Sequence, residues 1–137
     1  MKNTTAAQCL EIEVPKISDP RGNLSFIEKN IVPFRINRVY YLYDVPTDSY
    51  RGGHAHKNCH HFVIALTGSF DVELQDGMSL KTHTLKKPYK GLHIVPGIWR
   101  EIKNFSSGAV CLVVASDEFD EGDYIRSFDE FLRYKNQ

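Results

Sequence analysis

The sequence has few of the features that would tie it to nucleic acid, to a membrane or to an oxidising compartment. Among its 137 residues, 17 Lys and Arg balance 17 Asp and Glu, and the basic residues form no block. Charge therefore gives no support for binding to nucleic acid or to an anionic membrane, although a few converging arginines would suffice for a small anionic ligand. No apolar run approaches the roughly 18 residues of a membrane-spanning helix, and the N-terminus lacks the apolar core of a signal peptide.

Cysteine is scarce as well. The three cysteines, Cys9, Cys59 and Cys111, lie far apart and form no CxxC pair. An odd and scattered set predicts free thiols, and we therefore expect a cytoplasmic protein. We find no repeat, low-complexity tract or linker, and the length suits one domain, so residues 1–137 are predicted to form a single domain.

Short strand-like segments fill most of the chain. Residues 38–45 are aromatic and β-branched, and residues 60–77 read as two strands around a Thr-Gly-Ser turn. Further strand segments follow at even spacing: 79–85, 91–96, 99–105 and 109–116. This spacing is typical of an antiparallel sandwich or barrel, so the predicted fold class is all-β, with a single small barrel.

The C-terminal tail has a different pattern. After an acidic stretch at 116–123, apolar residues recur at helical spacing: Tyr124, Ile125, Phe128, Phe131 and Leu132. Asp123 is a suitable N-cap for a helix that begins there. We therefore expect a short C-terminal helix packed on the barrel, and a solvated acidic loop before it.

Histidine is concentrated in residues 51–61, RGGHAHKNCHH, which hold four of the six histidines. His54 and His56 are two positions apart, so their side chains share one face of an extended segment. On an unbroken strand His60 would share that face and His61 would point away. Three imidazoles on one face suit Zn, Fe or Ni, and the preceding glycines allow a close approach of the backbone to a ligand. Ordinary packing of these histidines is the other interpretation.

This stretch and a later one resemble a known fold family. RGGHAHKNCHHFVIALTG and GLHIVPGIWREIKNF look like the two motifs of a cupin, which implies a jelly-roll barrel. In metal-binding cupins two histidines and a glutamate of the first motif, with a histidine of the second, hold the metal. Here His60, or His61 with the longer spacing, takes the glutamate position, Arg100 takes the position of the second-motif histidine, and Asn104 keeps the following asparagine.

Arg100 bears on the metal question. An arginine stays protonated in proteins, so it cannot be a ligand and would repel a divalent cation. The site therefore suits an anion or a polarised oxygen, and we predict no metal and no cofactor. A three-histidine site made by His54, His56 and His60 stays an alternative, with Lewis-acid or oxygen chemistry.

The resemblance narrows over residues 10–134. The combination of RGGHAHK, PGIWRE and ASDEFDEGDYIR resembles the nucleotide-sugar 3,4-ketoisomerases, cupin enzymes that act on dTDP-4-keto-6-deoxy-D-glucose. The resemblance implies an isomerase for 3-amino-3,6-dideoxyhexose biosynthesis, with this nucleotide sugar as its ligand and neither nucleic acid nor membrane as a partner. It also implies a homodimer with exchanged N-terminal strands.

The family's reaction moves a ketone from C4 to C3 of the hexose through an enediol or enediolate. It needs a base of near-neutral pKa, such as an unperturbed histidine, and donors for the oxyanion. The resemblance implies that His54 and His56 face the sugar. We predict His54 as the base and His56 as the carrier of protons between the oxygens, an order that could be reversed. Tyr41 is our choice of donor to the oxygen, with Tyr40 and Tyr43 as rivals.

Arginines would bind the two phosphate charges, since guanidinium groups bind phosphate oxygens bidentately. The predicted substrate-binding residues are Arg51 and Arg100 within the motifs, Arg21 and Arg38 in the N-terminal strands, and Asn104. Family members differ at the positions of Arg21 and Arg100, so the C4 configuration of the product stays open. Trp99 fits a core role and a stacking role equally well, and Arg100 would point to the opposite face.

Three other functions stay open on the sequence. They are a 3,5-epimerase of the same nucleotide sugar, a metal-dependent cupin oxygenase and a non-catalytic nucleotide-sugar binding module. Outside the motifs we expect His83, His93 and Cys59 to be structural, and we expect His61 to lie outside the chemistry.

Overall fold

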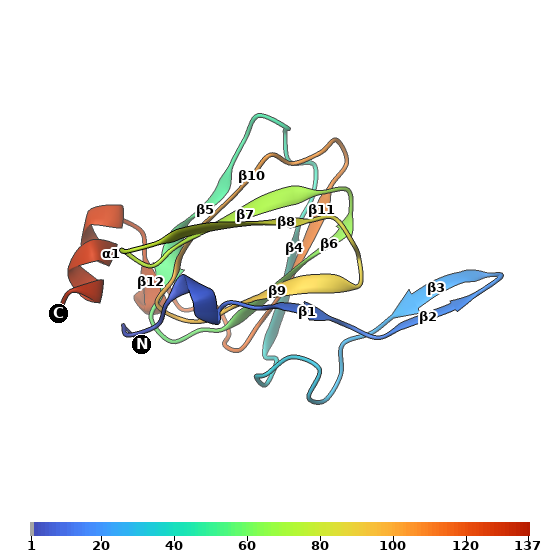
Figure 1. Cartoon of the computed structure of the whole chain (residues 1–137), viewed down its shortest axis with the longest axis horizontal. Helices are drawn as coiled ribbons and strands as arrows, with labels where there is room; N and C mark the ends of the chain where they lie inside the picture. Colours follow the sequence, from blue (N-terminus) through green and yellow to red (C-terminus); the bar gives the residue numbers. More distant parts are fainter. Residues whose placement is uncertain (1) are drawn as a thin grey trace.

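The chain runs as a series of short antiparallel strands that ends in one helix (Figure 1). The computed structural model describes residues 2–137. The N-terminal half holds a 3-10 turn (Ala6–Gln8), β1 (Glu11–Glu13), β2 (Lys16–Asp19), β3 (Gly22–Ser25), β4 (Arg38–Leu42), β5 (Arg51–His56) and β6 (His61–Thr67). The C-terminal half holds β7 (Phe70–Gln75), β8 (Leu80–Leu85), β9 (Lys90–Ile94), β10 (Trp99–Lys103), β11 (Val110–Ala115), a 3-10 turn (Glu121–Asp123), β12 (Tyr124–Ile125) and α1 (Phe128–Lys135).

Two five-stranded sheets form the walls of the barrel (Figure 1). One has the strand order β1-β9-β6-β11-β4, and the other has the order β12-β5-β10-β7-β8. Their strand pairs are antiparallel. The predicted all-β barrel with a short C-terminal helix is confirmed, and its form is a small jelly roll.

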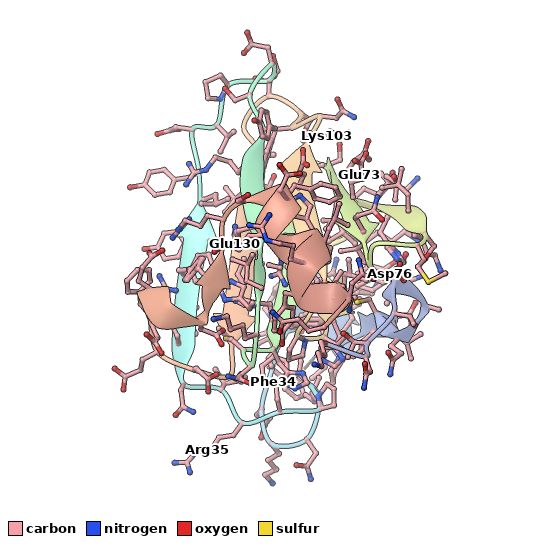
Figure 2. All side chains as sticks on the ribbon, turned by 90° about the vertical axis from the view of Figure 1, so that its left-hand side faces the viewer. Phe34, Arg35, Glu73, Asp76, Lys103 and Glu130 are labelled. Atoms are coloured by element: carbon pink, nitrogen blue, oxygen red, sulfur yellow. The ribbon has the colours of Figure 1, made fainter. Side chains whose placement is uncertain are left out.

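Period-two alternation explains why β7 lies where it does. Phe70, Val72 and Leu74 point into the main core and are 0–1% exposed, while the residues between them face outward. Burial of each such side chain contributes roughly 1.5–3 kcal/mol. On the outer face, Figure 2 shows Glu73 beside Lys103 of β10, and their ion pair is 2.6 Å long from Nζ to Oε2.

Strand β6 is covered on both faces, which explains its continuous apolar sequence. Val63 and Ala65 belong to the main core, whereas Phe62 and Ile64 belong to a second cluster under the segment 26–37. Phe34 of that segment stacks on His60 and contacts the tilted ring of His93, while the neighbouring Arg35 extends into solvent at the edge of the molecule (Figure 2). By the same alternation, the first residue of β6 faces inward with Val63.

The hairpin β2–β3 projects away from the barrel (Figure 1). All its residues are exposed, including Ile17 and Leu24, which are each 57% exposed. Arg21 lies in the turn of this hairpin and pairs with Asp19 at 2.8 Å. The hairpin therefore buries none of its apolar side chains within this chain.

The C-terminal helix begins later than predicted. Ser127 is the N-cap, and its hydroxyl accepts from the Glu130 amide. Tyr124 and Ile125 instead form β12 and pair with β5, because their backbone groups complete the edge of the second sheet. The helix is anchored by Phe131, which is fully buried. Among residues 2–137, no helix has the length and apolar character needed to cross a membrane.

Candidate active site

A cavity of about 350 Å³ opens between the two sheets. Its size lies in the range of small-molecule sites. Its polar lining consists of Arg38, Tyr40, Arg51, His54, His61, Arg100, Tyr124 and Arg126, and its apolar lining includes Leu42, Val63, Ile94, Ile102 and Val113.

A glycine brings β5 close to β10 at this cavity. Gly52 has φ +105°, and a Cβ there would lie 3.2 Å from the carbonyl oxygen of Arg100. Any other residue would be strained in this conformation. The register between the strands shifts after Arg100, which is the Cα partner of His54. The RGG and WRE motifs are therefore adjacent in space, as their joint resemblance implied.

His54 and His56 lie together, as expected from their spacing. Their rings meet edge to face with centroids 4.8 Å apart, and Tyr124 contacts both rings. His54 lines the cavity, whereas His56 lies behind it and is 3% exposed. The pair therefore extends from the cavity surface into the wall.

Asp123 fixes the orientation of His56. Its Oδ2 lies 3.2 Å from Nδ1 of His56, and its carboxylate also accepts from the backbone amides of Asn58 and Cys59. Nε2 of His56 is buried and has no hydrogen-bond partner among residues 2–137. A carboxylate accepts only, so the proton of a neutral imidazole belongs on Nδ1, and Nε2 keeps a free lone pair.

Both histidines are neutral near pH 7 in the free protein. Burial, with the positive charges of Arg100 and Arg126, lowers the pKa of His54 to about 3. Burial and Arg100 also lower the pKa of His56. The sequence suggested a base with an unperturbed pKa near 6.5. That expectation is wrong for the free protein, because it took account neither of burial nor of the effect of the neighbouring arginines on the pKa of His54.

Arg100 is a buried cation without an acidic partner. It is 4% exposed, and its guanidinium donates to the Ile98 carbonyl and to Nδ1 of His61, the latter at 3.2 Å. The ion pairs found among residues 2–137 do not include it. Burial lowers its pKa, but a guanidinium remains protonated. Its charge is therefore available to an anion in the cavity.

The placement of His60 and His61 is the reverse of the one predicted. His61 is 1% exposed and lines the cavity, whereas His60 stacks on Phe34 and contacts Nε2 of His93 at 3.0 Å. The reason is a turn between the end of β5 at His56 and the start of β6, which resets the alternation. The three-histidine arrangement with His60 is therefore not formed. Among the described residues, no group of three or more His, Cys, Asp and Glu side chains is arranged to hold a metal ion.

On β4, the structure places Tyr40 in the cavity instead of Tyr41. Arg38, Tyr40 and Leu42 face inward, so Tyr41 lies on the other face, 59% exposed, and Tyr43 is 62% exposed. The choice of Tyr41 as the oxygen donor is therefore wrong for this chain, because strand parity could not be set from sequence. Burial raises the pKa of Tyr40 to about 12, so its phenol remains a donor at neutral pH.

The predicted arginines divide into two groups. Arg38, Arg51 and Arg100 line the cavity, but Arg21 lies on the projecting hairpin, and the structure does not bring it to this cavity. Asn104 also lies outside the cavity lining: it occupies a turn with φ +58° and donates to Asp71 at 2.7 Å. The assignment of Asn104 to substrate binding therefore finds no support, because a shared motif position does not fix which way a turn residue points.

Sequence reasoning missed three residues of the site. Tyr124 and Arg126 line the cavity, and Asp123 orients His56. All three belong to the DYIR stretch, which carried the resemblance but was given no role in the site: Asp123 and Tyr124 were assigned to the C-terminal helix. Trp99, for which a core role and a stacking role were both open, packs on Phe128 and Phe131 outside the cavity, as in a core.

The other residues expected to be structural are also placed outside the cavity lining. Nδ1 of His83 lies 2.6 Å from Oε2 of Glu11, the ring of His93 stacks on that of His60, and Cys59 is buried.

The jelly-roll fold and its cavity of histidines and arginines define the chain as a cupin-type protein. A family model, FdtA, described as WxcM-like, C-terminal, matches residues 7–136. The chain belongs to this family.

Three proteins that resemble this chain are named as 3,4-oxoisomerases or 3,4-ketoisomerases. TDP-4-oxo-6-deoxy-alpha-D-glucose-3,4-oxoisomerase of Aneurinibacillus thermoaerophilus is 45% identical over 124 residues, which cover 90% of this chain and 89% of the relative. The sugar 3,4-ketoisomerase QdtA of Thermoanaerobacterium thermosaccharolyticum, solved in complex with TDP, superposes with a TM-score of 0.93 at 38% identity, covering 96% of this chain and 97% of QdtA. The TDP-quinovose 3,4-ketoisomerase WlaRB of Campylobacter jejuni is 46% identical, with a TM-score of 0.88 and coverage of 92% and 98%.

Proposed function

We propose that this chain is an isomerase that converts dTDP-4-keto-6-deoxy-D-glucose to the dTDP-3-keto-6-deoxyhexose. The observation that carries the proposal is the neutral His54 at the surface of a cavity lined by four arginines, with the neutral His56 in ring contact behind it. The relatives named as 3,4-ketoisomerases support the same reaction.

The arginines bind the anionic part of the substrate. Arg38, Arg51 and Arg126 line the cavity on β4, β5 and the segment after β12. Their guanidinium groups match the geometry of phosphate oxygens and attract the diphosphate. Arg100, deeper and 4% exposed, is left for an oxygen of the sugar.

The histidines move the protons. His54 removes the C3 proton; the electrons of the C3–H bond form the C3–C4 double bond, and the C4 carbonyl oxygen becomes an enediolate oxygen. Arg100 and Tyr40 donate to this oxygen as its charge develops. The oxygen on C4 is protonated, the C3 hydroxyl loses its proton, and C4 receives the proton from the base. His56, whose ring contacts that of His54, carries protons between the two oxygens, which requires its buried Nε2 to reach the sugar when the substrate is bound. The step needs no oxidant, metal or cofactor.

Substrate binding adjusts the base. In the free protein Arg100 and Arg126 help to depress the pKa of His54. The negative charge of the diphosphate offsets these cations, which raises the pKa of His54 toward the value that suits a general base. His54 therefore becomes a stronger base when the substrate is bound.

The active unit in this proposal is a homodimer with exchanged N-terminal strands. The exposed hairpin β2–β3, which carries Ile17 and Leu24 without burying them in its own chain, supports this exchange. Arg21 at its tip would then meet the partner subunit. We place the enzyme in the cytoplasm, in keeping with its three unpaired cysteines.

One experiment tests the reaction against its nearest alternatives. The protein is incubated with dTDP-4-keto-6-deoxyglucose in deuterated water, and the product is identified by NMR. A ketone at C3 with loss of the C3 hydrogen supports the proposal. A persisting C4 ketone with exchange at C5 indicates the 3,5-epimerase, and no turnover indicates a binding module. The same assay after dialysis against EDTA tests the oxygenase alternative, which requires lost activity that returns with metal.

A further inference from the structure

His61 has no role in the mechanism above, although it is among the most deeply buried polar residues. It is 1% exposed, opens β6 and lines the cavity beside Arg100. A buried polar side chain costs free energy unless it is hydrogen-bonded, so its two nitrogens need partners. Their partners are Arg100 on Nδ1, at 3.2 Å, and Cys59 on Nε2, at 3.7 Å to Sγ.

The partner on Nδ1 fixes the tautomer of His61. A guanidinium has donors only, so Nδ1 must accept from Nη1 of Arg100. The proton of the neutral imidazole is then on Nε2, directed at Sγ of Cys59, and a protonated His61 could not accept at all. Burial and Arg100 lower the pKa of His61 well below its ordinary value, which keeps the ring neutral. The hydrogen bonds thus form a chain in which Arg100, at the cavity, donates to His61, and His61 donates to Cys59.

The hydrogen bonds of Arg100 show how its guanidinium is restrained. Three of its N–H groups donate: one each from Nε and Nη2 to the Ile98 carbonyl, and one from Nη1 to Nδ1 of His61. A guanidinium has five N–H donors, so two remain for a ligand. The Ile98 carbonyl holds one edge of the group, and His61 is the other restraint. No carboxylate among the described ion pairs contributes.

We propose that His61 is a positioning residue, whose Nδ1 holds the guanidinium of Arg100 with its two unused donors directed at the reacting oxygens of the sugar. The inference deepens the proposed function and rests on it for the identity of the substrate. Without the acceptor, the guanidinium can rotate away from the oxygens, and a misplacement of about 1 Å costs roughly 10²-fold in rate.

Two nearly isosteric variants separate positioning from packing. In His61→Asn the amide oxygen takes about the place of Nδ1 and can accept from Arg100; in His61→Leu no acceptor remains. We expect kcat to fall about 10²-fold in His61→Leu and to stay within about fivefold of wild type in His61→Asn, with KM changed less than about threefold in both. The neighbouring His60→Asn, outside the cavity lining, is the matched control with wild-type kcat.

A measurement without substrate completes the test. In ¹⁵N NMR, a guanidinium held by hydrogen bonds shows separate Nη signals for Arg100, and a freely rotating one shows an averaged signal. We expect separate signals in wild type and His61→Asn and an averaged signal in His61→Leu.

The outcomes are distinguishable. A His61→Leu variant with kcat within threefold of wild type, equal losses in the Asn and Leu variants, or Arg100 signals that His61→Leu leaves unchanged would each overturn the inference. If wild type gives no 3-keto product, the proposed function fails, and the NMR comparison still decides whether His61 positions Arg100.

Discussion

Replacing Asp123 by asparagine tests whether this carboxylate sets the tautomer of His56 that the mechanism needs. The carboxylate lies 3.2 Å from Nδ1 of His56 and also accepts from the amides of Asn58 and Cys59. An asparagine has one oxygen for these three groups: with the oxygen on Asn58, its NH₂ group faces Nδ1 of His56 and the Cys59 amide, and with the oxygen on His56 and Cys59, its NH₂ group faces the Asn58 amide. In the first orientation Nδ1 must accept and the proton moves to Nε2, which removes the free lone pair that the mechanism uses; in both orientations His56 loses the anionic partner that stabilises its protonated form.

The magnitudes follow from these contacts. The variant loses a charge-assisted contact and part of the support for the turn at 57–60, so we expect a loss of about 2–3 kcal/mol in the free energy of unfolding. For a chain of this length, that lowers Tm by roughly 10 °C. Positioned acid–base catalysis is worth about 10²–10⁴ in rate, so we expect kcat to fall by a factor in that range.

The assay is product formation followed by NMR at a temperature below the Tm of the variant. Asp120→Asn is the matched control, because Asp120 lies in the same loop and accepts only from the Gly122 amide, which an asparagine oxygen can replace. The control should keep wild-type kcat. An Asp123→Asn enzyme that is folded and has kcat within threefold of wild type would refute the tautomer argument.

Three further predictions concern the cavity and its support. Tyr40→Phe should lower kcat about 10²-fold by removing an oxyanion donor, whereas Tyr41→Phe, on the exposed face, should leave kcat within twofold; equal effects in steady-state kinetics would contradict the assignment. The base acts when neutral, so activity is lost as pH falls through its pKa. We expect kcat/KM to stay flat from pH 8 to below pH 5, because His54 in the free enzyme has a pKa of about 3, and we expect the acid limb of kcat to lie at higher pH. An acid limb of kcat/KM near pH 6.5 would show that burial and the arginines do not lower the pKa of His54 as described. Phe131→Ala, which empties a fully buried site that anchors α1, should cost about 3–5 kcal/mol in urea unfolding, and a loss below 1 kcal/mol would mean that the helix does not depend on this contact.

The fold could be predicted largely from local pattern. The alternation of β7 and the even spacing of turns are properties of neighbouring residues, and they predicted β4 and β6 to β11 correctly, whereas the bounds of β1, β2 and β3 were not predicted. The helix start was misjudged because Tyr124 and Ile125 have helical spacing to Phe128, but their backbone groups pair with β5, a strand some seventy positions earlier. Such pairing is a long-range effect that no local pattern contains.

The position of a side chain in the cavity could be predicted where a motif fixed both residue and direction, as for His54 and Arg100; His56 lies behind the cavity instead of facing it. The prediction failed where the direction of a side chain depended on a turn or on the parity of a strand. The turn before β6 exchanged the expected places of His60 and His61, and the parity of β4 put Tyr40 inside and Tyr41 outside. The depressed pKa of His54 was not foreseen either, because its largest cause is burial, which appears only in the folded chain, and because Arg126 was not assigned to the site.

The most direct test of the central claim is the identity of the product formed from dTDP-4-keto-6-deoxyglucose in deuterated water, compared between wild type and His54→Asn. The account predicts that wild type yields the 3-keto sugar with loss of the C3 hydrogen, and that His54→Asn binds dTDP but forms product at least about 10²-fold more slowly. A product that retains the C4 ketone, or a His54→Asn variant with wild-type turnover, would contradict it.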